Sequence, residues 1–169
     1  MNDVLVHETT DDDRTAVLAF LRELWGGEEM VVHDEVLRPA ELPGYVAVDR
    51  GHLFGLATFR IEADAVELVS LDSLRPSQGV GGALLNRVER EAASRGCASV
   101  WLITTNDNLG ALRFYQKRGY RIVRVDPGAV DRARARKPAI PLVGDDGIPI
   151  RDELVLEKSL PGVGQEETG

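Results

Sequence analysis

The sequence predicts an α/β (α+β) fold, with a mixed central sheet flanked by helices. Short β-rich runs and amphipathic helical patterns succeed one another along the chain. Three consecutive runs between residues 45 and 71 are joined by turns so short that their strands are expected to be antiparallel. A glycine-rich turn over 78–83 then leads into a helix. With 169 residues, the chain fits one domain, predicted over 1–160, and a polar tail over 161–169 is expected to be disordered.

The N-terminal part predicts a short strand over 4–7 and a helix that ends at Trp25. Thr9 or Thr10, followed by three aspartates, is typical of a helix start, and Gly26 is typical of a helix end. From 26 to 43 the apolar residues show little periodicity, so we expect a surface loop or a short helical piece. Such loops often shape substrate pockets.

The next three runs, over 45–49, 52–61 and 65–71, predict an antiparallel meander with turns at 50–51 and 62–64. The last strand runs directly into the glycine turn. The helix that follows carries its apolar residues on one stripe and ends at Gly96; these residues are Val80, Leu84, Leu85, Val88 and Ala92.

The second half predicts three further strands, over 99–104, 120–125 and 153–158. The first is almost continuously apolar, as in a strand covered on both faces. Asn108 and its neighbours supply capping groups for a helix that closes at Gly119. Asp126 as cap and Pro127 at the first position predict a short basic helix to residue 137. Residues 140–149 are expected to form a loop.

The composition limits the classes of binding partner that are expected. The net charge of −8 disfavours nucleic acid and favours cationic partners such as amines. Residues 116–137 nevertheless hold eight Lys or Arg against two Asp, which would suit either an anionic ligand or a solvated helix face. No apolar run is long enough to span a membrane. The N-terminus lacks a secretory pattern and the single Cys97 allows no internal disulfide, so a cytoplasmic location is expected.

Metal binding is not expected, because the three histidines are scattered without metal-ligand spacing. The glycine turn has two readings. Glycines let backbone N–H groups approach a ligand closely, and a helix N-terminus favours anions, which together suit a pyrophosphate. A glycine cluster before a helix is also common as a plain tight turn.

Two linked motifs resemble the GNAT superfamily of acyl-CoA-dependent N-acyltransferases. Gln78, Gly81 and Ala83 match its signature of Gln or Arg, two residues, Gly, one residue, Gly or Ala. A second register, starting from Pro76, fits the phase of the helix leucines better, and Arg75 could then supply the basic contact. Downstream, a pattern similar to the family's runs from Asn108 through Ala111 and Tyr115 to Gly119.

The resemblance implies a GNAT fold with an N-terminal antiparallel meander and splayed central strands, and acetyl-CoA as co-substrate. It places the pyrophosphate on residues 78–83 and the pantetheine beside the strand over 67–71, with an oxyanion donor from the amide of Leu68 or Val69. Tyr115 matches the general acid. The implied cofactor-binding residues are Leu68, Val69, Ser70, Leu71, Gln78, Gly79, Val80, Gly81, Gly82, Ala83, Asn108, Ala111 and Tyr115.

The acceptor is expected to be a primary amine of a small molecule, protein or peptide. Glu67 matches the place of a carboxylate base in relatives, with Asp72 as an alternative, and Trp25, Glu29 and His33 could line the acceptor pocket. The chain is expected to act as a monomer or homodimer, without nucleic acid, membrane or metal. An alternative is a non-catalytic acyl-CoA-binding sensor or partner module. A Rossmann-type nucleotide domain fits poorly, since several strands precede the glycine turn.

Overall fold

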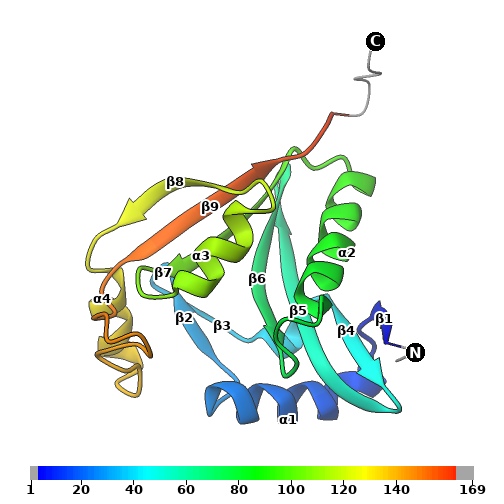
Figure 1. Ribbon diagram of the computed structural model, residues 1–169, viewed down its shortest axis with the longest axis horizontal. Coiled ribbons are helices and arrows are strands. Elements are labelled where there is room, and N and C mark those ends of the chain that lie inside the picture. Colours follow the sequence, from blue (N-terminus) through cyan, green and yellow to red (C-terminus); the bar gives the residue numbers. More distant parts are fainter. Residues whose placement is uncertain (1–3, 163–169) are drawn as a thin grey trace. The chain divides into compact units, whose positions relative to one another are not determined.

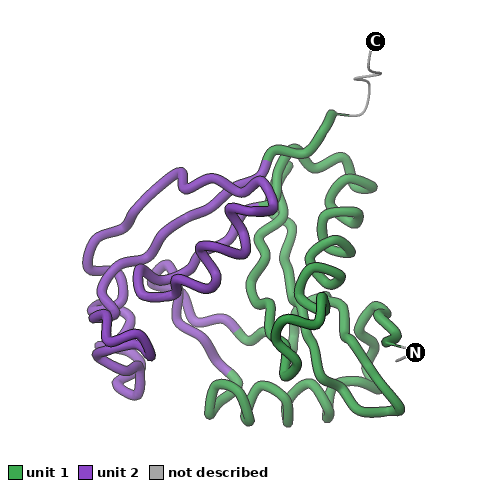
Figure 2. Tube along the Cα trace, viewed as in Figure 1, with its two compact units in different colours: residues 1–28, 38–100, 159–169 green, residues 29–37, 101–158 purple. Residues whose placement is uncertain are grey.

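The computed structural model describes residues 4–162, which divide into two compact units (Figure 2). Within that range, the first unit comprises residues up to 28, 38–100 and from 159 onward, and the second comprises 29–37 and 101–158. The single domain expected over 1–160 stays a prediction. Most of the tail expected to be disordered, from 163 onward, lies outside the described residues.

The first unit contains the predicted meander. Its four strands are hydrogen-bonded in the order β1 (Leu5–Glu8), β4 (Gly44–Asp49), β5 (His52–Glu62) and β6 (Ala65–Ser73), and every pair is antiparallel (Figure 1). The turn between β4 and β5 is the two-residue turn that the sequence predicts. Arg50 and Gly51 both have positive φ, at 49° and 79°, as a hairpin with a type I′ turn requires.

Two helices cover opposite faces of this meander. The turn η1 (Asp11–Asp13) leads into α1 (Arg14–Trp25), whose Val17 and Leu21 pack with Leu56 of β5. Helix α2 (Val80–Ser94) packs against Gly55, the residue before Leu56 in β5. A Cβ added to Gly55 would lie 2.8 Å from Val80 Cγ1. Successive residues of a strand point to opposite faces. The predicted apolar stripe of α2 is confirmed, since its five residues are buried.

Strand β6 contains a β-bulge. Thr58 pairs with Ser70 but the next residue, Phe59, pairs with Leu68, so Val69 is an extra residue in β6. The alternation of side chains therefore shifts by one residue at this point.

The second unit contains β7 (Ser99–Thr105) from Trp101 onward, then β9 (Glu153–Ser159) and β8 (Arg121–Asp126) in hydrogen-bonded order. Strands β8 and β9 are antiparallel. This unit also holds α3 (Leu109–Gln116), α4 (Ala129–Arg136) and a two-stranded hairpin of β2 (Met30–Val32) and β3 (Glu35–Leu37). The α/β class, the antiparallel meander and the flanking helices are confirmed; the splaying of the central strands stays a prediction.

Two local predictions were wrong. The segment over 26–43 is not simply a loop or helical piece, because it contains the β2–β3 hairpin as well as the turn η2 (Pro39–Glu41). His33 and Asp34 form the hairpin turn with φ of 52° and 60°, a backbone region that non-glycine residues seldom adopt. Helix α4 starts at Ala129 rather than Pro127, because Gly128 takes a left-handed conformation and forms its N-cap.

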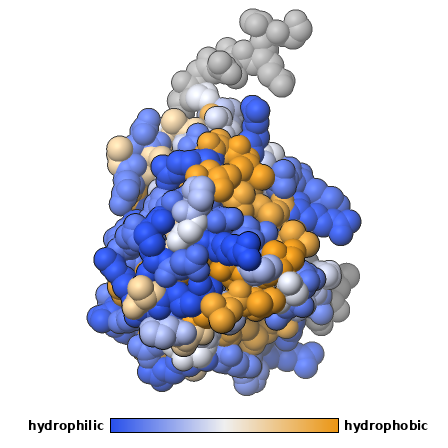
Figure 3. Space-filling model, turned by 90° about the vertical axis from the view of Figure 1, so that its left-hand side faces the viewer, coloured by the Kyte–Doolittle hydropathy of each residue, from blue (hydrophilic) through white to orange (hydrophobic). Residues whose placement is uncertain are grey.

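Strand β8 comes last in the strand order and is mostly exposed. Its exposed apolar residues are Ile122, Val123 and Val125. Apolar side chains gather in a strip on the side of the molecule that Figure 3 presents. No helix within residues 4–162 combines the length and the apolar character that a membrane span requires.

Candidate functional site

The glycine turn leads into α2 through left-handed backbone conformations. Ser77 and Gly79 have positive φ, at 65° and 78°, and α2 begins directly after them at Val80. The first intrahelical bond runs from the Ala83 N–H to the Gly79 carbonyl, at 3.0 Å. The amide of Ala83 is therefore used by the helix. The amides of residues 79–82 precede that bond and point along the helix start, where the dipole favours an anion.

The basic group next to this turn is already engaged. Arg75 Nη1 lies 2.9 Å from Asp49 Oδ2, and the guanidinium carbon lies 4.2 Å from the centre of the Phe54 ring. Arg75 therefore fixes the end of β6 to the β4–β5 hairpin. A role as the basic contact of the second motif register would require Arg75 to leave Asp49.

The Val69 bulge puts three polar side chains of β6 on one face. In the pairing of β6 with β5, Glu67 lies opposite Arg60, Ser70 opposite Thr58 and Asp72 opposite Leu56. The three β5 residues are two positions apart, so their side chains point to the same face of the sheet. Because Leu56 packs with α1, this is the α1 face. Without the extra residue, Glu67 would point to the other face. We call Glu67, Ser70 and Asp72 the polar row.

Two members of the polar row have close partners. Glu67 has a side chain that is only 3% exposed and accepts a hydrogen bond from Arg60 Nε. The hydroxyls of Ser70 and Thr58 lie 2.6 Å apart. Both pairs are in the interior of the first unit, where an unpaired polar group would be costly.

Asp72 differs from them. Its Oδ1 accepts a hydrogen bond from the indole N–H of Trp25 at 3.4 Å, the long end of hydrogen-bonding distances. Its Oδ2 is buried without a hydrogen-bond partner. Burial raises the pKa of Asp72 to about 6, and the Trp25 bond opposes the rise only in part. A half-buried carboxylate that has a buried, unused oxygen and a raised pKa is characteristic of functional sites.

In the second unit, α3 carries the residues of the downstream motif. The Asn108 side chain caps the helix by accepting a hydrogen bond from the Ala111 N–H at 3.1 Å. Tyr115 is buried, and its ring meets those of Phe114 and Tyr120 edge to face, with centres 5.0 and 5.5 Å apart. The motif therefore has a structural role in α3. A role in binding or catalysis would be additional to that structural role.

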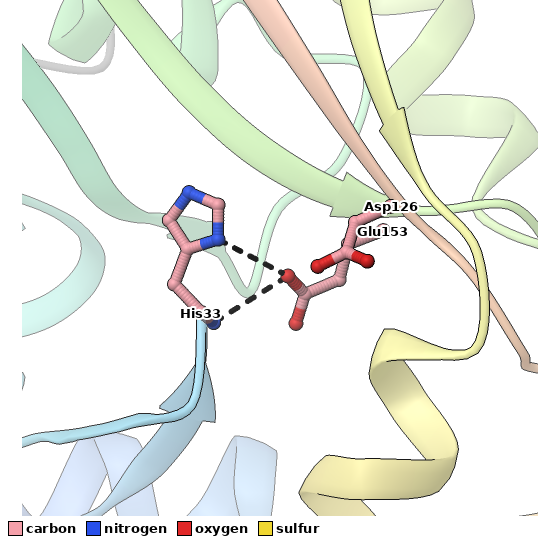
Figure 4. A group of neighbouring side chains, drawn as sticks. All are labelled: His33, Asp126 and Glu153. Carbon is pink, nitrogen blue, oxygen red and sulfur yellow. Dashed lines mark hydrogen bonds and ion pairs between the residues drawn. The ribbon is translucent and has the colours of Figure 1, made fainter.

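The second unit also holds a cluster of three titratable side chains, which sequence reasoning did not bring together (Figure 4). Glu153 of β9 is 3% exposed, and its Oε2 lies 3.4 Å from the His33 backbone nitrogen and 3.8 Å from His33 Nδ1. Asp126, at the end of β8, is the third member. Burial raises the pKa of Glu153, while the contacts with His33 oppose the rise.

The geometry of His33 disfavours a metal at this cluster. Arg124 Nη2 lies 2.9 Å from His33 Nε2. Arginine can only donate, so Nε2 is the acceptor and the ring proton is on Nδ1, the nitrogen that faces Glu153. A metal ion needs a lone pair that neither nitrogen then offers. The cluster instead holds the β2–β3 hairpin against β8 and β9.

The basic segment around α4 serves the same hairpin. Arg132 pairs with both Asp126 and Asp34, and Arg136 donates to the Asp34 carbonyl. Lys137 Nζ lies 2.8 Å from the Glu29 carbonyl. Several of these cations therefore have partners within the protein, which favours a structural role for the segment over an anionic ligand.

The residues predicted to line the acceptor pocket divide between the units. Trp25 ends α1 in the first unit, while Glu29 and His33 belong to the hairpin of the second. Sequence reasoning missed Arg60, Asp126 and Glu153 as members of charged clusters. Glu153 opens an alternating run that reads as a half-buried strand, so only its burial in the structure distinguishes it.

A cavity of about 220 Å³ lies in the first unit, beside Leu56 and Thr58 of β5. Its lining also includes Thr10, the N-cap of η1, Arg14 at the start of α1 and Glu41 of η2. The lining includes none of the residues predicted to bind acetyl-CoA or the acceptor.

Comparison with known proteins identifies the fold and its family. The family model described as "Acetyltransferase (GNAT) family" matches residues 7–120. The chain belongs to the GNAT family of acetyltransferases. Its fold and its class as an acetyltransferase thus agree with the expectation from the two motifs.

One relative shares much of the sequence of this GNAT chain, and two solved structures share its fold. It is 47% identical over 145 residues to YxbD of Bacillus subtilis (strain 168), described as uncharacterized, covering 85% of this chain and 91% of YxbD. Among solved structures, an IAA acetyltransferase from Bacillus cereus ATCC 14579 has a TM-score of 0.70 at 20% identity, covering 94% of this chain and all of that one. A GNAT acetyltransferase from Elizabethkingia anophelis with acetyl-CoA bound has a TM-score of 0.68 at 19% identity, covering 95% and 100%.

Proposed function

We propose that this GNAT protein transfers the acetyl group of acetyl-CoA to a primary amine by direct attack in a ternary complex. The observation that carries the donor assignment is the start of α2, where left-handed residues and a run of glycines leave the amides of 79–82 ahead of the first helical bond. Those amides and the helix dipole would hold the pyrophosphate, the dipole contributing about 1 kcal/mol. The structure of similar fold from Elizabethkingia anophelis, which has acetyl-CoA bound, supports this donor.

The pantetheine and thioester would lie along residues 68–71 of β6. The Val69 bulge takes one residue out of the regular ladder, so a backbone amide of Leu68 or Val69 is proposed to bind the oxyanion. Asn108 and Ala111 would contact the pantetheine arm. Tyr115 would protonate the departing CoA thiolate.

The acceptor ammonium must lose a proton before it can attack, because an alkylamine has a pKa of about 10. A carboxylate of β6 is the proposed base, and both Glu67 and Asp72 belong to the polar row on one face. The acidic composition, with a net charge of −8, suits a cationic acceptor of small-molecule or peptide type, in the cytoplasm. Trp25, Glu29 and His33 are proposed acceptor contacts.

A screen of amines tests the proposal. The full chain would be mixed with acetyl-CoA and a broad panel of amines, including small polyamines, amino sugars and peptides. Free CoA thiol would be measured by a colorimetric reagent and acetylated products by mass spectrometry. The expected result is thiol release that depends on one class of amine. Tight acetyl-CoA binding without turnover on the whole panel would instead support a non-catalytic acyl-CoA-binding module.

A further inference from the structure

The three acidic or hydroxyl side chains of the polar row are not equivalent. Glu67 is almost completely buried and forms an ion pair with the guanidinium of Arg60. The hydroxyl of Ser70 forms a hydrogen bond with that of Thr58. Asp72 is half-buried and keeps one oxygen, Oδ2, without a hydrogen-bond donor. Among the row, Asp72 therefore has the capacity to accept a further donor.

Asp72 also forms no ion pair with any Lys, Arg or His among residues 4–162. Arg75, which follows β6, is paired with Asp49. Arg22, in the last turn of α1, is paired with Glu28. Within the described residues, the Asp72 side chain has one polar contact, the long hydrogen bond from Trp25. A carboxylate enclosed without a counter-charge is unfavourable, and a cationic ligand would remove that cost.

Trp25 is placed to yield to such a ligand. It is the last residue of α1 and is followed by Gly26 and Gly27, around which an added Cβ would meet nothing within 4 Å. Within the part of the chain that the structure describes, its indole N–H donates one hydrogen bond, the 3.4 Å contact with Asp72. An ammonium group can replace this N–H at the carboxylate, and the indole face can then contact the cation.

We propose that Asp72 is the catalytic residue that binds the acceptor's ammonium group and takes its proton, with Trp25 as the aromatic wall beside it. This assignment rests on the proposed N-acetyl transfer and selects Asp72 over Glu67 as the base. Its carboxylate turns about the Cβ–Cγ bond, a torsion with a broad energy minimum, to present the unused oxygen.

The proton balance follows directly. One proton moves from the ammonium to Asp72 and the neutral amine then attacks the thioester carbonyl, forming the C–N bond. The C–S bond breaks when the tetrahedral intermediate collapses, and the thiolate sulfur takes a proton from Tyr115. The second amine proton leaves the product nitrogen and replaces the proton that Tyr115 gave. The shifted pKa of Asp72, about 6, makes it a stronger base than an exposed aspartate.

The test compares Asp72→Asn with the wild type on an amine that the wild type acetylates. We expect kcat/KM to fall by about 100-fold or more, the range of a positioned base, while the Kd of acetyl-CoA measured by calorimetry stays within about twofold. Trp25→Leu should raise KM for the amine more than it lowers kcat, because the wall contributes to binding. Asp64→Asn, in the exposed β5–β6 turn, is the matched control and should behave as wild type.

The outcomes are distinguishable. A wild type that turns over an amine and an Asp72→Asn variant with the same kcat/KM would overturn the assignment of Asp72 while leaving acetyl transfer intact. A wild type that binds acetyl-CoA and acetylates nothing would overturn both the proposed function and this assignment. Thermal melting of each variant shows whether it is folded, and a fall in kcat/KM in a variant that melts no lower than wild type supports the proposal.

Discussion

Arg60 donates a hydrogen bond through Nε to Oε2 of Glu67, across the neighbouring strands β5 and β6. The carboxylate is 3% exposed and the guanidinium 20% exposed. Removing the arginine would leave a buried charge without its main partner. We expect Arg60→Met to lower the free energy of unfolding by about 3 kcal/mol or more, measured by denaturant titration.

The matched control is the exposed pair of Arg95 and Glu91 on α2, where the arginine side chain is 55% exposed. Arg95→Met should cost less than about 1 kcal/mol. The double variant Arg60→Met with Glu67→Leu should recover part of the lost stability, since apolar groups can replace a buried pair. Equal losses in Arg60→Met and Arg95→Met would contradict this description of the pair.

Asp72 gives the protein a specific pH dependence of stability. Its pKa in the folded protein is about 6, against an ordinary value of 3.8. Between these values the folded state binds more protons than the unfolded state, so the free energy of unfolding falls as pH rises through this window. The full loss is up to about 3 kcal/mol above the window. Urea titrations at about pH 4 and about pH 7 measure it.

The control is Asp72→Asn, which cannot ionise. At neutral pH the variant should gain unfolding free energy relative to the wild type. This gain should become smaller as the pH is lowered. If the two proteins show the same pH dependence over this window, then Asp72 does not carry it.

Tyr115 is expected to affect turnover rather than donor binding. Tyr115→Phe keeps the ring and its edge-to-face contacts with Phe114 and Tyr120 but removes the hydroxyl. We expect kcat to fall by about 100-fold or more, with the Kd of acetyl-CoA changed little. Steady-state kinetics and calorimetry separate the two effects. An unchanged kcat would remove Tyr115 as the proposed acid.

Gly81 is expected to matter for the donor. A branched side chain in the first turn of α2 would keep a pyrophosphate away from the amides of 79–82, so Gly81→Val should weaken acetyl-CoA binding by about tenfold or more. Ala93→Val, at an exposed position of the same helix, is the control for the lower helix propensity of valine. Normal affinity in Gly81→Val would count against the proposed pyrophosphate site.

The sequence predicts correctly those turns and helix ends whose signals come from neighbouring residues. The Arg50–Gly51 turn and the Asn108 cap, for example, depend on residues next to one another. The β2–β3 hairpin was missed because its strands are only three residues long and its turn uses His33 and Asp34 at positive φ instead of glycine. Pro127 favoured a helix start that Gly128 in fact supplies.

The candidate site was less accessible from sequence. Glu67 and Ser70 are three residues apart, which in a regular strand places them on opposite faces. Their shared face depends on the Val69 bulge, which the pairing of β5 with β6 reveals. The partners of Glu67 and Asp72, Arg60 and Trp25, lie on other elements of the chain, so their contacts depend on tertiary packing.

The Val69 bulge has a consequence for how this family can vary. Side chains of β6 alternate between the α1 face and the α2 face, and this alternation shifts by one residue at Val69. Loss of this one residue would turn Glu67 toward the α2 face and bring its apolar neighbours Val66 and Leu68 to the α1 face. Many substitutions within β6 keep this arrangement, but a change of one residue in its length does not. Homologues that share the polar row are therefore expected to keep the number of residues between Glu67 and Asp72, even where the bulged residue itself differs.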